Sequence, residues 1–304
     1  MANSTEPLDP QVLKLACVLL VGVLAVVFDT TIVNVVLDRL AMDMAAPISV
    51  IQWVTTGYLL ALAMAVPVTG WLFDRFGGKT LWIAALGIFL AGSIACSLAW
   101  NAESLIAFRI VQGIGGGLML PVMQTLLVQA AGARALGRIA AIVALPALLG
   151  PILGPVLGGF IVESINWRWI FWINVPFCVA GIALAAWVMP SIPGAHRQSF
   201  DAIGFLLLSP GIAAVLYGLS RVAVEGGFGA LDVILPFAAG LLLVGTFIIR
   251  AVTMSGAPLV DMKLLRVPSL SAATQQLFLS GFVLYGAMLL IPLYAQQVLG
   301  YGTF

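Results

Sequence analysis

Nine long segments of this chain contain almost no charged residues, and this feature limits the possible folds more than any other. A helix needs about 20 mainly apolar residues to cross a bilayer, and each segment approaches or exceeds that length. Hydrophobic residues make up 62% of the 304 residues and charged residues only 8%. Soluble domains carry about 25% charged residues. The sequence therefore predicts an all-α integral membrane protein with helices at Leu15–Leu37, Val50–Phe73, Thr80–Trp100, Ser104–Ala130, Ile139–Val162, Trp169–Pro190, Ala202–Ser220, Val233–Ile249 and Val267–Ala295.

Lysine and arginine residues are distributed unevenly between the two sets of connecting segments. Cytoplasmic loops of membrane proteins are enriched in these residues. With a cytoplasmic N-terminus, the connections on that side hold nine of them and the opposite connections hold Arg39, Arg168 and Arg221. The asymmetry predicts a cytoplasmic N-terminus, and nine helices then place the C-terminal end outside. Because no polar tail follows the last helix, we expect a fragment or a truncated product.

The composition and motifs argue against several classes of function. A net charge of +1 provides no basic surface for nucleic acid. The single histidine, His196, lies in a predicted loop, so we expect neither a metal site nor a histidine-based triad. The run Gly113–Gly117 lacks the preceding strand and the following Lys-Ser/Thr of a phosphate-binding loop. A membrane enzyme therefore has little support in this sequence, and we expect no catalytic residues.

One predicted helix carries glycines at every fourth position, namely Gly150, Gly154 and Gly158, with Pro151 and Pro155 beside them. Glycine and proline are poor helix formers in water. In a membrane, a stripe of small residues lets two helix backbones approach closely, and neighbouring helices satisfy the carbonyls that proline leaves free. The pattern predicts a bent transmembrane helix packed tightly on another helix. A packing surface without a further role is the simpler interpretation.

Two charged residues, Asp29 and Arg109, lie inside predicted membrane segments. A charge at mid-bilayer costs about 3 kcal/mol on insertion scales, so such residues are functional candidates. From the helix ends, a rise of 1.5 Å per residue places both in the outer half of the membrane, at roughly the same level. We expect them to face each other, with Arg109 keeping Asp29 ionised until a proton or a cationic substrate competes. A fixed structural ion pair, or two unrelated polar contacts, is the alternative.

A short charged segment, Gly70–Lys79, joins the second and third predicted helices on the cytoplasmic side. Its length predicts a tight turn. Asp74 is suited to a helix N-terminus, while Arg75 and Lys79 are suited to the anionic membrane surface. An anchor of the positive-inside type is the simpler interpretation.

Five motifs together resemble the major facilitator superfamily, and specifically its drug:proton antiporters with fourteen spans. The segment Gly70–Lys79 is similar to the family's cytoplasmic motif G-x-L-x-D-R-x-G-R-K, with Phe73 in place of a small residue and Gly78 in place of a basic one. The resemblance assigns a cytoplasmic gating loop to Gly70, Asp74, Arg75, Gly77 and Lys79.

The other motifs follow in the family's order along the chain. Arg109, Gln112, Gly113 and Gly115 resemble the fourth-helix motif R-x-x-Q-G-x-G, which the family links to proton coupling. The fifth-helix antiporter motif, associated with export, corresponds to Gly150, Pro151, Gly154, Pro155, Gly158 and Gly159. The first-helix motif runs from Asp29 to Asn34, and the stretch typical of the subfamily includes Trp167, Arg168, Asn174 and Pro176.

The resemblance implies a major facilitator fold of which only part is present. Residues 1–13 would form a cytoplasmic N-terminus and residues 14–190 the N-terminal six-helix bundle. Residues 191–253 would supply two intervening helices. Residues 254–304 would supply a cytoplasmic loop and the first helix of an incomplete C-terminal bundle. In this architecture the substrate cavity lies between two bundles that rock against each other, and we expect the fifth helix to pack on the second bundle.

The function implied by the resemblance is proton-coupled export of small amphipathic or cationic compounds across the cytoplasmic (inner) membrane by alternating access. Asp29, Arg109 and Gln112 would take part in proton coupling. The proton gradient would drive transport without a cofactor, and the partners would be the small-molecule substrate and the lipid bilayer around a monomeric permease. A periplasmic adaptor would be a partner only in a Gram-negative cell. The alternatives are a metabolite exporter or uptake porter of the same fold, and a non-transporting truncated membrane protein.

Overall fold

The computed structural model of the chain describes residues 9–132, 137, 150, 153–154, 156–161, 164–191, 194, 199–225, 227–254 and 256–297. Within these ranges every regular element is a helix. The first part contains α1 (Pro10–Val35), α2 (Leu37–Asp43), α3 (Ile48–Ala65), η1 (Val66–Val68), α4 (Thr69–Phe76), α5 (Gly78–Ser97) and α6 (Ala102–Ala131). The second part contains α8 (Trp169–Trp172), α9 (Asn174–Val188), α10 (Ala202–Glu225), α11 (Leu231–Thr253), η3 (Met262–Arg266) and α12 (Pro268–Gln297).

Seven helical stretches in the described ranges are long and apolar enough to cross a membrane. They agree with seven of the predicted segments; α3, η1 and α4 form one stretch, and α8 and α9 another. Most of the predicted segment Ile139–Val162 lies outside the described residues. The ninth segment corresponds to α12. The protein is therefore an all-α, multi-pass membrane protein, as the sequence predicts.

Local sequence signals explain where several helices begin and end. Asn101 caps α6: its Oδ1 accepts from the backbone amide of Ser104 at 2.8 Å, and the Ser104 hydroxyl accepts from the amide of Asn101 at 3.2 Å. This reciprocal capping satisfies amides that a helix N-terminus leaves free. The predicted tight turn after Gly70 is a single residue, Gly77, whose φ of 79° ends α4 and begins α5. A left-handed φ of this kind favours glycine.

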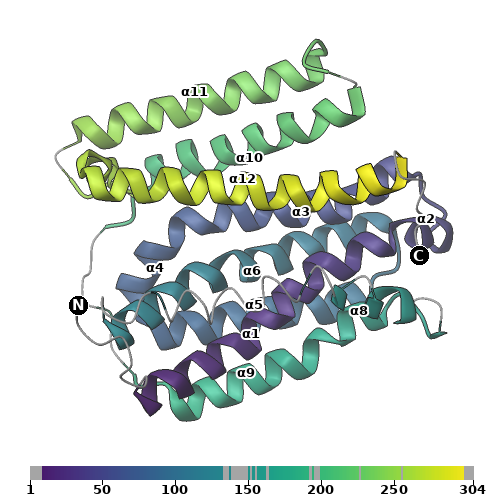
Figure 1. Ribbon diagram of the computed structural model, residues 1–304, viewed down its shortest axis with the longest axis horizontal. Helices are drawn as coiled ribbons and strands as arrows, with labels where there is room; N and C mark the ends of the chain where they lie inside the picture. Colours follow the sequence, from purple (N-terminus) through teal and green to yellow (C-terminus); the bar gives the residue numbers. More distant parts are fainter. Residues whose placement is uncertain are drawn as a thin grey trace.

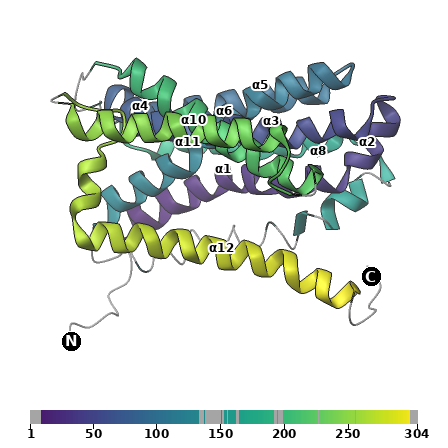
Figure 2. The ribbon, with the colours of Figure 1, turned by 90° about the horizontal axis from the view of Figure 1, so that it is seen from above.

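The helices form one bundle with an additional pair beside it and a further helix set apart. Figure 1 shows α1, α9, α5, α6 and α3 side by side, with α10 and α11 beyond α3. Large side chains fill the bundle interior, and those with almost no exposed surface include Trp82, Leu86, Phe89, Met119 and Phe171. Figure 2 shows α12 apart from the layer of the other helices. Its described side chains are mostly exposed.

The α10–α11 pair is attached to the first bundle by aromatic contacts at two levels. Near the start of α3, Trp53 stacks on Tyr217 of α10, with ring centroids 5.4 Å apart. In α4, Trp71 packs against Phe200, which precedes α10, with centroids 4.8 Å apart. Offset and tilted aromatic pairs contribute about 0.5–1.5 kcal/mol each beyond burial of their surface. Specific ring contacts therefore hold α10 against the first bundle at both levels.

Asp201 joins the start of α10 to the end of α11. Its Oδ2 accepts from Arg250 Nη1 at 2.8 Å and from the backbone amide of Leu259 at 3.1 Å, and its Oδ1 accepts from the amide of Gly204 at 2.9 Å. Burial alone raises the pKa of the Asp201 carboxyl. The hydrogen bonds from Arg250, Gly204 and Leu259 outweigh burial and hold this pKa below its usual value.

This depressed pKa predicts a loss of stability at acidic pH. An aspartate whose pKa is lower in the folded state stabilises the fold above its unfolded pKa of about 3.9, and this contribution disappears as the pH falls through the folded value. We expect the melting temperature to decline below about pH 4, and Asp201→Asn to make that decline smaller. Thermal unfolding in detergent across this pH range is the measurement. Asp232→Asn is the control, because Asp232 is 73% exposed and 4.0 Å from Arg221; an equal effect of both variants would contradict the assignment.

Candidate functional site

The two charges that the sequence places inside the membrane meet in the bundle interior. Arg109 Nη1 on α6 lies 2.5 Å from Asp29 Oδ2 on α1. The side chains are 1% and 0% exposed, respectively. The prediction that they face each other is therefore confirmed, and the alternative of two unrelated polar contacts is wrong.

Three side chains donate hydrogen bonds to the Asp29 carboxylate. Arg109 binds Oδ2, whereas Gln112 Nε2 and Asn174 Nδ2 each donate to Oδ1 at 2.9 Å. We call Asp29, Arg109, Gln112 and Asn174 the buried charge cluster. All four residues are buried. The cluster joins α1, α6 and α9, and its three donors match the acceptor-only character of an ionised carboxylate.

Arg109 has further partners that hold its guanidinium in place. Its Nε donates to the backbone carbonyl of Val54 on α3 at 3.2 Å, and its Nη1 donates to Gln112 Oε1 at 2.8 Å. The guanidinium carbon lies 3.9 Å from the ring centroid of Tyr58, a cation–π arrangement. A buried ion pair repays the cost of leaving water only when its remaining donors are satisfied. These contacts satisfy Nε and Nη1 and place the guanidinium against an aromatic face.

The glycines of α6 explain how its backbone reaches its neighbours. Arg109 and Gln112 are three residues apart, so they share one face of the helix. A Cβ on Gly113 would lie 2.5 Å from the carbonyl oxygen of Tyr58 on α3, and one on Gly115 would lie 2.5 Å from the amide of Phe89 on α5. Close contact with α3 and α5 therefore requires glycine at these positions. The run Gly113–Gly117 is a packing surface that brings the cluster together.

Asn174 is the first residue of α9 and follows the short helix α8 after one residue. α8 ends at Trp172 and α9 begins at Asn174, with Ile173 as the turn between them. Pro176 lies in the first turn of α9, and proline has no amide hydrogen and clashes with the carbonyl four residues earlier, here Trp172. The sequence N-V-P thus places an amide side chain at the start of α9, within the membrane-spanning stretch Trp169–Val188.

The structure shows three contributors that the sequence reasoning missed. Ser93 on α5 accepts from Asn174 Nδ2 at 3.0 Å and donates to the carbonyl of Phe171 at 2.9 Å. Tyr58 supplies the aromatic face for Arg109, and Cys96 Sγ lies 3.6 Å from Gln112 Oε1. Ser93 and Cys96 are three residues apart on α5, so polar atoms at helical spacing in an apolar span are the signal that could have found them.

The remaining subfamily residues lie outside the cluster. Arg168 Nη2 donates to the carbonyl of Ala99 at 3.0 Å and stacks on the ring of Trp167, which itself is 2% exposed. Asn34 is at the α1–α3 contact, where its Oδ1 accepts from Thr55 Oγ1 at 3.4 Å. These contacts hold helix ends together, so Asn174 is the one member of this motif at the buried ion pair.

The glycine stripe faces α1. A Cβ on Gly150 would meet Val27, one on Gly154 would meet Thr31, and one on Gly158 would lie 3.2 Å from Ile32. The prediction of close packing on another helix is confirmed, and the helix that the stripe contacts is α1 of the first bundle. Packing of the fifth helix on the second bundle stays a prediction. A Cβ on Gly159 would meet no described atom within 4 Å. Pro151 and Pro155 lie outside the described residues.

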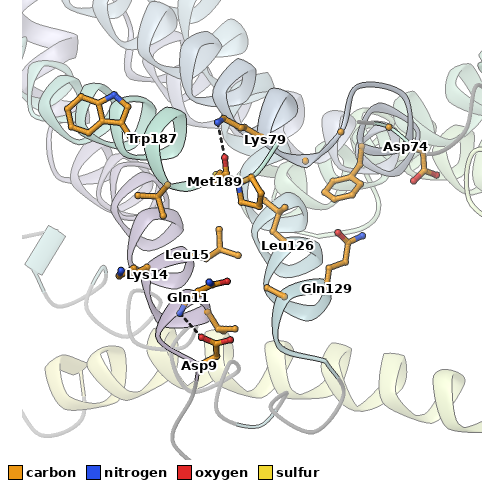
Figure 3. Close-up of a pocket in the computed structure, with 18 residues that line it drawn as sticks. Asp9, Gln11, Lys14, Leu15, Asp74, Lys79, Leu126, Gln129, Trp187 and Met189 are labelled. Carbon is orange, nitrogen blue, oxygen red and sulfur yellow. Dashed lines mark hydrogen bonds between the residues drawn. The ribbon is translucent and has the colours of Figure 1, made fainter. Parts of the chain in front are cut away.

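The predicted gating loop borders a cavity at the ends of α1, α5, α6 and α9. The cavity measures about 810 Å³, and its wall includes Lys14, Leu15, Asp74, Lys79 and Leu126. Figure 3 shows Lys79 directed to the end of α9, where its Nζ donates to the carbonyls of Ala186 at 2.7 Å and Met189 at 2.8 Å. A cation at a helix C-terminus is favourable. Lys79 therefore fastens α5 to α9.

The other loop residues have different surroundings. Asp74 and Arg75 are exposed, and a Cβ on Gly70 would meet no described atom within 4 Å. A Cβ on Gly194 would lie 2.7 Å from the carbonyl carbon of Arg75. Gly194, in the connection between α9 and α10, therefore lies directly against this turn. Among the described residues no group of three or more His, Cys, Asp or Glu side chains could hold a metal ion.

Comparisons with known proteins agree with this arrangement. A family model described as Major Facilitator Superfamily matches residues 19–304. The Multidrug resistance protein B homolog of Mycobacterium tuberculosis (strain CDC 1551 / Oshkosh) is 38% identical over 294 residues, covering 97% of this chain and 54% of that protein. The Methylenomycin A resistance protein of Bacillus subtilis (strain 168) is 32% identical, covering 94% of this chain and 61% of that protein. The chain spans about half the length of the curated relatives it matches.

A solved structure supports the fold alone. The inward open conformation of the xylose transporter XylE from E. coli superposes with a TM-score of 0.55 at 18% identity, covering 79% of this chain and 68% of that chain. The family match extends over most of the chain, and the fold agrees with it. The chain belongs to the major facilitator superfamily, a family of membrane transporters.

Proposed function

We propose that the chain forms part of a proton-coupled exporter of small amphipathic or cationic compounds. The buried charge cluster is the observation that supports this most directly. An ionisable pair fully enclosed by packed helices is expensive in a membrane, and such residues are functional candidates by default. Relatives named for resistance to drugs and antibiotics favour export over uptake or metabolite transport.

The proposed coupling step is protonation of Asp29. In its ionised form Asp29 holds Arg109 on α6 and Asn174 on α9 together with α1. A proton on the carboxylate removes the ion pair and so weakens the attachment between these helices. A cationic substrate near Asp29 would compete for the same negative charge. Moving one proton inward releases about 2.3 kcal/mol per 100 mV of membrane potential, which can drive a substrate outward.

The setting of this activity follows from the same proposal. The lysine and arginine asymmetry supports a cytoplasmic N-terminus in the cytoplasmic (inner) membrane. The proton gradient would serve in place of a cofactor, and the partners would be the substrate and the bilayer around a monomeric permease. The part of the relatives' length that this chain does not cover would supply the second bundle, so that the substrate path forms between the halves.

The test is proton release upon substrate binding or transport in the complete transporter, reconstituted in liposomes. We expect Asp29→Asn to abolish substrate-dependent proton release and uphill export, because an amide cannot take up the proton. The matched control is Asp43→Asn, since Asp43 is exposed and pairs with Arg39 one helical turn away at 3.2 Å. Unchanged proton release in Asp29→Asn would reject the coupling role.

A further inference from the structure

One polar atom of the buried charge cluster is left without a partner among the described residues. Asn174 Nδ2 donates both to Asp29 Oδ1 at 2.9 Å and to Ser93 Oγ at 3.0 Å. Its carbonyl oxygen, Oδ1, is buried and accepts no hydrogen bond from the described part of the chain. A buried acceptor without a partner destabilises the state that contains it. The Asn174 amide therefore donates to the Asp29 carboxylate through Nδ2, while its own Oδ1 is able to accept a hydrogen bond.

Arg109 and Gln112, the other two side chains that donate to Asp29, cannot become hydrogen-bond acceptors for it. Arg109 carries only donors. Gln112 has its Oε1 fixed by Arg109 Nη1 at 2.8 Å, so turning its amide over would bring its NH₂ group against the guanidinium. Asn174 has no cation at its amide: its other neighbour is the Ser93 hydroxyl, which can move its one hydrogen from the Phe171 carbonyl to Asn174 Oδ1 when the amide turns over. Of the three side chains that donate to Asp29, Asn174 alone can turn over and accept a hydrogen bond from the protonated carboxyl.

We propose that Asn174 is a positioning residue that lets Asp29 hold a proton by turning its amide over. One proton from solvent binds Asp29 Oδ1, and the hydrogen bond from Asn174 Nδ2 to that oxygen is lost. The new O–H of Asp29 then donates to Asn174 Oδ1, and no covalent bond of Asn174 changes. The inference rests on the proposed proton coupling and adds the residue that adapts to both states of the carboxyl.

The other groups around Asp29 can keep their contacts while the Asn174 amide turns over. Within the described ranges, the titratable side chains that interact with Asp29 from neighbouring helices are Arg109 on α6, Tyr58 on α3, Cys96 on α5 and Cys178 on α9. Of these, Arg109 alone is a cation. When Asp29 becomes neutral, Arg109 keeps the Val54 carbonyl, Gln112 Oε1 and the Tyr58 ring. The rearrangement at Asn174 therefore does not require Arg109 to leave its site.

Infrared difference spectroscopy of the complete transporter between high and low pH tests the inference. Asparagine labelled with a heavy isotope at its side-chain carbonyl identifies the amide, and comparison with Asp29→Asn and Asn174→Leu assigns the two bands. We expect a protonated-carboxyl band from Asp29 to appear together with a shift of the Asn174 carbonyl band. An Asp29 band with an unchanged Asn174 band would overturn the amide turn while leaving proton coupling intact. Absence of the Asp29 band at every pH would overturn both.

Variants at Asn174 provide a second measurement. Asn174→Leu has a similar shape but neither donates nor accepts, so we expect proton-driven export to fall at least tenfold. Asn174→Gln retains a donor and an acceptor and should recover part of that loss. Both are compared as folded, monodisperse protein. Export by Asn174→Leu at the wild-type rate, or equal losses in both variants, would overturn the proposal.

Discussion

Arg109→Leu should destabilise the protein more than the double replacement Arg109→Leu/Asp29→Asn. The single variant leaves the Asp29 carboxylate buried with two amide donors and no cation. Breaking a buried ion pair from one side typically costs about 3–5 kcal/mol, whereas replacing both partners is often close to neutral. We therefore expect the double variant to recover most of the lost stability, although it should not couple transport to protons.

Thermal unfolding of the four proteins of this double-mutant cycle, purified in detergent, measures the coupling. Arg39→Leu is the control for removing an arginine, because the Arg39–Asp43 pair is exposed, with side chains 56% and 32% accessible. An exposed pair of this kind is worth about 0.2–1 kcal/mol. A double variant as unstable as Arg109→Leu would contradict the view that an uncompensated buried charge causes the loss.

Gly154→Leu should prevent the first bundle from packing and abolish export by the complete transporter. A side chain at this position would enter the space of Thr31 on α1, whose hydroxyl donates to the carbonyls of Val27 at 3.0 Å and Phe28 at 3.1 Å. Extra volume in a packed interior costs about 1–3 kcal/mol or more when the backbone must move. Here the nearest atoms belong to a helix that also carries Asp29.

Gly159→Leu is the matched control on the same predicted helix, since a Cβ there meets no described atom within 4 Å. The measurements are the yield of monodisperse protein, its melting temperature and export in liposomes. We expect Gly154→Leu to lower yield and melting temperature, and Gly159→Leu to keep both near the wild-type values. Similar losses in the two variants would mean that glycine is needed for the helix itself, not for contact with α1.

The sequence predicts the membrane helices and the ion pair because both follow from the cost of leaving water. Hydropathy and helix length identify the segments, and the scarcity of buried charges makes Asp29 and Arg109 partners. The packing partners of a surface are harder to predict. The stripe Gly150–Gly158 predicts close approach by its spacing, but nothing in that spacing distinguishes α1 from a helix of the second bundle.

The roles of several common side chains also could not be predicted from the sequence. Ser93 and Tyr58 look like many other residues in apolar spans, and they matter because α5 and α3 bring them beside Asn174 and Arg109. Lys79 was expected at the membrane surface, whereas the structure has it bound to the end of α9. Its role depends on where α9 ends in space, which the local sequence around Lys79 does not contain.

The aromatic pairs Trp53–Tyr217 and Trp71–Phe200 have a consequence for movement. Trp53 and Trp71 are separated by about 27 Å along a helical path, nearly the thickness of the hydrocarbon core. A helix pair held near both membrane faces cannot swing separately from its bundle. We therefore expect the α10–α11 pair to travel with the first bundle as one block, with the hinge between the two halves falling after α11.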